Sequence, residues 1–138
     1  MKTVDWAKSK IIADVVDARI SECLANVMRA FLDYRNILPE DAIHVEGLYW
    51  YGGQIGLHTW IETENYIIEL SLVRETNREL RETVRHYKIL TRDENEIKKL
   101  YGDKSRVPGD SLIMELNWDD PRVEKLANEV DSPPKLRH

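Results

Sequence analysis

Three residues of this sequence have the types and spacing of a nucleophilic site, beginning with its single cysteine, Cys23. Ser21 precedes it by two residues and is a good helix N-cap, so we expect Cys23 at the second position of a helix. The free N–H groups there favour a thiolate, and a neighbouring imidazolium favours it further. Without such a base, Cys23 is better interpreted as a small buried hydrophobic residue.

The other two candidates, His58 and Glu69, lie in the apolar runs GLHTWIET and YIIELSLV, which predict a β-hairpin. A two-residue turn at Thr63 and Glu64 places His58 opposite Glu69, with Cβ atoms about 4.5–5.5 Å apart. A longer turn changes this register. Glu69 has apolar neighbours on both sides, so its carboxylate needs a buried partner. A base that takes the thiol proton and an acid that fixes the tautomer of that base complete a catalytic triad, whereas His58 alone is an ordinary core histidine.

Four segments resemble the papain-like, transglutaminase-like group of cysteine–histidine–acid proteins: ECLANVMRAF, HVEGLYW, LHTWIET and IIELSL. The resemblance covers residues 20–73 and implies Cys23 as the nucleophile, His58 as the general base and Glu69 as the orienting acid. The family usually has an aspartate at the third position. Other positions that match the family pattern are Asn26, Glu46, Gly47 and Trp60.

The donors of an oxyanion hole are less clearly marked. Papain-like peptidases carry a glutamine before the cysteine, but residues 1–22 contain no glutamine. The backbone N–H of Cys23 is one candidate donor, and the side chains of Asn26 and Gln54 are others on chemical grounds. Trp50 and Trp60 are candidates for the wall of a substrate groove, with core packing as the alternative.

The elements that must position these residues follow from hydrophobic periodicity. We expect two helices between residues 2 and 38, with a break near 17–21, and then three antiparallel strands at 42–51, 54–63 and 66–73. A helical or loop segment at 75–83, a strand at 84–91, a helix at 92–102, a strand at 111–118 and a helix at 121–130 complete the pattern. This order predicts an α+β fold, with N-terminal helices packed on a mostly antiparallel sheet, as in the papain-like and transglutaminase-like folds. Residues 1–131 are expected to form one domain and residues 132–138 a tail.

Composition narrows the class of function. The content of 42% hydrophobic and 33% charged residues is that of a globular protein, and the net charge of −5 argues against a nucleic-acid partner. We expect a cytoplasmic protein because the sequence has neither an apolar run of membrane-spanning length nor a signal peptide. One cysteine excludes an internal disulfide. His44 and Glu46 lack a visible third ligand, so we expect neither a metal nor a cofactor.

The sequence thus favours a cysteine-dependent hydrolase or acyltransferase that acts on an amide, peptide or ester bond. Its partner would be a peptide or a small amide or ester substrate. Two alternatives remain open: a binding or accessory module that keeps the fold without catalysis, and a structural protein in which the three residues meet by coincidence. The sequence indicates neither the oligomeric state nor a role for residues 75–138, and it assigns no role to His86.

Overall fold

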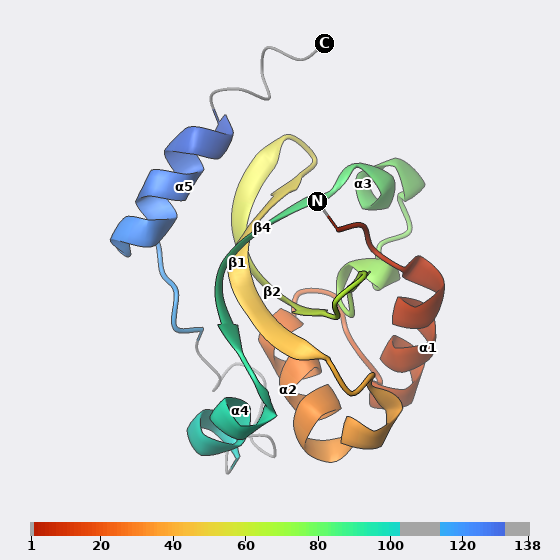
Figure 1. Cartoon of the computed structure of the whole chain (residues 1–138). Helices are drawn as coiled ribbons and strands as arrows, with labels where there is room; N and C mark the ends of the chain where they lie inside the picture. Colours follow the sequence, from red (N-terminus) through yellow and green to blue (C-terminus); the bar gives the residue numbers. More distant parts are fainter. Residues whose placement is uncertain (1, 103–113, 132–138) are drawn as a thin grey trace.

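The computed structural model describes residues 2–102 and 114–131 and has an α+β fold (Figure 1). Its elements, with two short 3-10 helices η1 and η2, are α1 (Trp6–Val16), α2 (Cys23–Asp33), η1 (Arg35–Ile37), β1 (Ile43–Tyr51), β2 (Gln54–Glu62), β3 (Ile67–Ile68), η2 (Leu72–Arg74), α3 (Arg78–Thr83), β4 (Arg85–Arg92), α4 (Glu94–Tyr101) and α5 (Pro121–Asp131). The strands form one antiparallel sheet in the order β3-β2-β1-β4. Figure 1 shows this curled sheet with α1 and α2 next to β3 and β2, and with α5 next to β1.

The central hairpin of the sheet joins β1 to β2 through Gly52 and Gly53. Both glycines have positive φ angles, 58° and 82°, which suit a two-residue hairpin turn and disfavour other residues. The register that follows from this turn pairs Gly47 with His58 and Tyr49 with Gly56. These four residues therefore share one face of the sheet, from which the side chains of His58 and Tyr49 project.

A bulge disturbs the pairing of β1 with β4 between Glu46 and Gly47. A Cβ atom on Gly47 would lie 2.1 Å from the carbonyl oxygen of Tyr87, so only glycine allows β4 to approach this closely. After the bulge, Tyr49 pairs with His86, which places His86 on the same face as His58.

Both faces of the sheet are covered by apolar residues. Helices α1, α2 and α4 form the largest core with Ile61 and Ile68, and α5 packs on Leu48 of the same face through Val123. On the opposite face, Trp60 is fully buried in a smaller cluster that includes Val45, Ile67 and Val4. The candidate site lies on this second face.

Most of the predicted elements are confirmed, including the two N-terminal helices, the β1–β2 hairpin, the strand at β4 and the helices α4 and α5. Other predicted features are wrong. Ser21 is not the N-cap of α2: the cap residue is Glu22, and Ser21 has a left-handed φ of 70°. The strand predicted at 66–73 pairs only at Ile67 and Ile68, after which the chain turns into η2.

The predicted strand at 111–118 is not found at residues 114–118, and residues 111–113 lie outside the described part. The predicted tail at 132–138 also lies outside it. In the described segments, no helix has the length and apolar character needed to cross a membrane.

Candidate active site

The backbone before Cys23 is fixed by the side chain of Asn26, one turn further along α2. The amide oxygen of Asn26 accepts the N–H of Arg19 at 3.1 Å, and its amide nitrogen donates to the carbonyl of Arg19 at 2.7 Å. The same nitrogen donates to the Ser71 hydroxyl at 2.9 Å. Because Asn26 is fully buried, these bonds fix the loop that starts α2 and set the position of Cys23 as the first residue of the helix.

A second side chain ties this loop to the segment that carries Glu69. Arg74, at the end of η2, donates to the carbonyls of Ala13 and Ala18 at 3.0 Å and pairs with Asp14 at 2.7 Å. The two segments of the site, residues 17–23 and 69–75, are thus held together by buried or partly buried polar contacts. Such support reduces the freedom of the reactive groups relative to one another.

His58 lies on β2, facing Gly47, and is covered by the ring of Tyr49. The two ring centroids are 4.4 Å apart and the planes nearly parallel, at 18°. Gly56 makes this stacking possible, because a Cβ atom there would lie 2.5 Å from the Tyr49 ring. The imidazole is therefore buried and held in one plane, with 4% of the residue exposed.

Glu69 reaches His58 from a register that differs from the predicted one. The loop between β2 and β3 has four residues rather than two, and Ile61 pairs with Ile68. Extended by one residue, this register places Glu69 beside Trp60 and diagonal to His58, a separation that a long side chain can bridge. Both carboxylate oxygens lie 2.9 Å from His58 Nε2. The direct opposition was predicted wrongly, but the expected contact between the two side chains exists.

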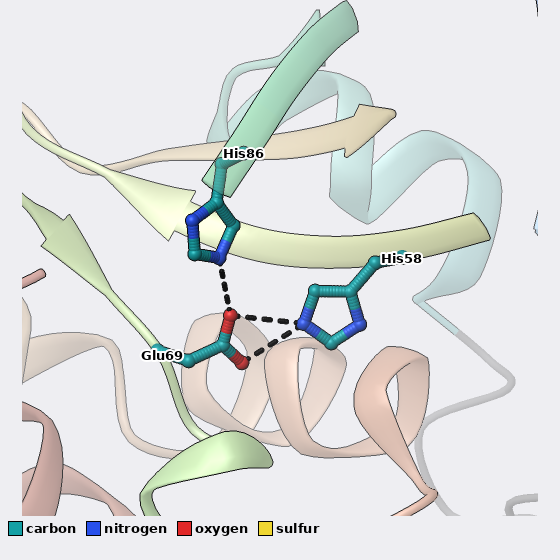
Figure 2. Close-up of side chains that lie close together, drawn as sticks. All are labelled: His58, Glu69 and His86. Atoms are coloured by element: carbon teal, nitrogen blue, oxygen red, sulfur yellow. Dashed lines mark hydrogen bonds and ion pairs between the residues drawn. The ribbon is translucent and has the colours of Figure 1, made fainter. Parts of the chain in front are cut away.

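The carboxylate of Glu69 has a second side-chain partner, which sequence reasoning missed. His86 on β4 lies with its Nε2 2.7 Å from Glu69 Oε2, and its side chain is only 3% exposed. Figure 2 shows the two imidazoles approaching the carboxylate from different strands. The sequence indicated only that a buried Glu69 needs a hydrogen-bonding partner. It did not identify His86 as the residue that supplies a second hydrogen bond.

These contacts set the charges of the site. Burial alone raises the pKa of Glu69, but the charge and hydrogen bond of His58, together with the hydrogen bond of His86, outweigh it and lower the pKa to about 2. For His58, burial lowers the pKa, whereas the Glu69 charge and hydrogen bonds to Cys23 and Glu69 raise it to about 10. The site therefore holds an ionised carboxylate next to an imidazolium at neutral pH.

The thiol and the imidazole open onto one cavity. This cavity has a volume of about 290 Å³, and Cys23 and His58 both line it, together with Tyr49, Tyr51 and Glu75. Since Glu69 occupies Nε2 of His58, Nδ1 is the ring nitrogen that is left for another partner. A ligand in the cavity can meet the thiol and the base together.

The other residues predicted for an oxyanion hole or groove do not line this cavity. The amide of Asn26 is used within the fold, and Gln54 lies exposed at the β1–β2 turn. Trp50 projects from the opposite face of the sheet, where Arg85 lies over its ring at 5.4 Å. Trp60 is fully buried behind the site, where it packs edge-on against His86 at 4.7 Å.

Glu46, which matches the family pattern, belongs to a different cluster on the opposite face of the sheet. It pairs with Arg92 of β4 and accepts the backbone N–H of Leu116 at 3.1 Å. Glu46 thus attaches the segment before α5 to the sheet. His44 in the same cluster lies 2.6 Å from Thr59 Oγ1.

Three side chains of the site also have the types that bind transition metals. His58, Glu69 and His86 each offer a ligand atom, and these atoms lie within 4.8 Å of one another. Two imidazoles and a carboxylate are a common ligand set for Zn²⁺ and Fe²⁺. The short N···O distances are equally those of charge-assisted hydrogen bonds, so the ligand set alone does not decide between a proton and a metal.

Comparison of the chain with protein families, with curated proteins and with solved structures finds no match. The geometry of the site therefore carries the functional argument.

Proposed function

We propose that this protein is a cysteine-dependent hydrolase or acyltransferase, of the papain-like or transglutaminase-like kind, that acts on an amide, peptide or ester bond. The observation that carries the proposal is the position of His58, which is held by Glu69 at Nε2 and lines the same cavity as Cys23. A nucleophile, a base and an orienting acid in this order are the requirements of thiol-based acyl transfer.

The reaction starts with the proton on His58, whose pKa is raised, and with Cys23 as its thiolate partner. The thiolate then attacks the carbonyl carbon of the substrate, and the negative charge moves to the carbonyl oxygen. Cys23 is the first residue of α2, and the first N–H groups of a helix have no partner within it, so they are the nearest donors for this oxygen. As the intermediate collapses, the leaving amine or alcohol takes the proton from His58 and a thioester to Cys23 remains. Water or another acceptor, deprotonated by His58, then releases the acyl group.

A binding module with the same cavity is the alternative. The stacked rings of Tyr49 and Tyr51 in the cavity wall favour it, because they suit a ligand without requiring a reaction. In that case the His58–Glu69 pair has a structural role, and Cys23 has the reactivity of an ordinary partly buried thiol. The two functions differ in whether His58 controls the reactivity of Cys23.

Alkylation by iodoacetamide tests this difference directly, because the chain has one cysteine. At pH 6 we expect His58→Ala to slow the alkylation of Cys23 by about tenfold or more, since the thiolate loses its cationic partner. Mass spectrometry of the intact protein gives the rate. Alkylation in guanidinium chloride is the control and should be equal in both proteins. Equal native rates would contradict the proposal.

The alkylation rate also tests whether His58, Glu69 and His86 are joined by hydrogen bonds or bind a metal ion. EDTA should leave the alkylation rate of the wild-type protein unchanged when His58 and His86 hold protons rather than an ion. A change in rate that returns on addition of Zn²⁺ would instead assign His58, Glu69 and His86 to a metal centre.

A further inference from the structure

The wall of the catalytic cavity contains one acidic side chain that the proposed mechanism does not use. Glu75 follows η2 directly, is half-buried and lines the cavity with Cys23 and His58. Its backbone N–H donates to the carbonyl of Leu72 at 2.9 Å, which fixes the turn that carries it. The preceding cation, Arg74, pairs with Asp14 instead, and among the described residues no cationic side chain forms an ion pair with Glu75.

Two tyrosine rings form the wall beside this carboxylate. Tyr49 and Tyr51 stack with their centroids 5.5 Å apart and their planes at 12°. The hydroxyl oxygen of Tyr51 is buried and lies near Glu75, but within the described part of the chain no atom meets full hydrogen-bond geometry with it. Buried hydroxyls normally have a partner, so this one is suited to a ligand. The faces of aromatic rings also attract cations.

The charges around the cavity favour one sign of ligand. The imidazolium of His58 is balanced by Glu69, which lies behind the cavity wall, whereas Glu75 is an acidic side chain of the wall without a cationic partner among the described residues. Burial, followed by the charge of Glu75, raises the pKa of Tyr51 to about 12, so its phenol stays neutral. The cavity therefore has a net negative charge.

From these contacts we infer that the substrate carries a protonated amine or a guanidinium group, which binds Glu75 and the ring of Tyr51 while its carbonyl meets Cys23. This inference rests on the proposed function, because it describes the substrate of the same site. The inference has two requirements. A small molecule with a cationic group must bind near Cys23 more favourably than a neutral or anionic molecule of similar size, and Glu75 must cause this preference.

Methanethiosulfonate reagents test both requirements without a known substrate. The thiolate of Cys23 attacks the sulfenyl sulfur of the reagent, a mixed disulfide forms, and methanesulfinate leaves. The rates of Cys23 modification are measured at pH 7 with the 2-aminoethyl, the 2-sulfonatoethyl and the methyl reagents. Each rate is divided by the rate at which the same reagent modifies glutathione. We expect the corrected rate of the aminoethyl reagent to exceed that of the sulfonatoethyl reagent, and Glu75→Gln to lower this ratio by about tenfold.

Glu79→Gln is the matched control, because it removes the same charge from an exposed position on α3 outside the cavity wall. It should keep the wild-type ratio, and the methyl reagent should react at similar rates with all three proteins. A wild-type ratio of aminoethyl to sulfonatoethyl rates near one, or a ratio that Glu75→Gln does not lower, overturns the inference. The proposed function is still supported in that case if the alkylation of Cys23 depends on His58. Failure of all three reagents to modify native Cys23 overturns the proposed function and the inference with it.

Discussion

At the scale of single residues, the main feature of the site is that one carboxylate serves two imidazoles. Glu69 is fully buried, and each of its oxygens is within 2.9 Å of an imidazole nitrogen. The backbone N–H of Leu72 points to Oε1 at a longer distance of 3.4 Å. His86 therefore supplies the strongest contact of Glu69 besides His58, and it orients the acid that in turn orients the base.

Replacement of His86 tests this role. We expect His86→Leu to lower the free energy of unfolding at pH 7 by roughly 1–3 kcal/mol, because Oε2 loses a donor in a buried position. It should also slow the alkylation of Cys23 at pH 6 several-fold, because Glu69 then holds His58 less firmly.

His86→Gln is the matched variant, since its amide can donate near the position of the imidazole Nε2–H. Both properties should return toward wild type in this variant, as measured by urea unfolding and by intact-mass kinetics. A loss of stability in His86→Leu with an unchanged rate of alkylation would assign His86 to the fold alone.

At the scale of elements, the sequence predicts local contacts far better than contacts between distant strands. His58 and Glu69 were found because they lie in adjacent apolar runs, where a hairpin is the simplest arrangement. The register was wrong because the turn after β2 holds four residues, and turn length sets which residues pair.

His86 was not predictable in the same way. It reaches the site only because β4 pairs with β1, more than 35 residues earlier in the chain, and because the bulge at Glu46 and Gly47 shifts the register. The candidate donors Asn26 and Gln54 were chosen by residue type alone, and type does not reveal that the amide of Asn26 is already used to hold the loop before Cys23. Tertiary contacts of this kind leave no periodic pattern in the sequence.

The bulge also makes a prediction about the elements. Gly47→Ala places a methyl group against the backbone of Tyr87, which cannot move without shifting β4 and the attached His86. We expect a loss of roughly 1–3 kcal/mol in the free energy of unfolding, and slower alkylation of Cys23 in the folded variant. Gly53→Asn is the control, because that site has open space and asparagine tolerates its positive φ. Equal stability of the two variants would show that β4 adapts to a side chain at position 47.

At the scale of the whole molecule, the sheet separates two buried polar clusters. One face carries His58, Glu69 and His86, and the other carries His44 with Glu46 and Arg92. The two sets are separated because successive residues of a strand project to opposite faces. His44 and His58 are held in opposite protonation states. Burial, followed by the charge of Arg92, lowers the pKa of His44 to about 3, whereas the pKa of His58 is raised to about 10.

This opposition predicts a maximum of stability near pH 6.5. His44 binds a proton more readily in the unfolded chain, so its contribution is complete above about pH 6.5 and is lost as the pH falls toward 3. His58 binds a proton more readily in the folded chain, so its contribution is complete below about pH 6.5 and is lost as the pH rises through 10. The change is up to about 1.4 kcal/mol per pH unit for each proton.

Urea unfolding at pH 4.5, 6.5 and 9 measures both sides of this maximum. His44→Gln should reduce the acid slope between pH 4.5 and 6.5, where Glu69 contributes only a small part because its ordinary pKa is 4.5 and its folded pKa is about 2. His58→Gln should flatten the alkaline side between pH 6.5 and 9. An alkaline slope that persists in His58→Gln would mean that His58 is neutral in the folded protein at neutral pH. The imidazolium that the site needs to hold a thiolate would then be absent.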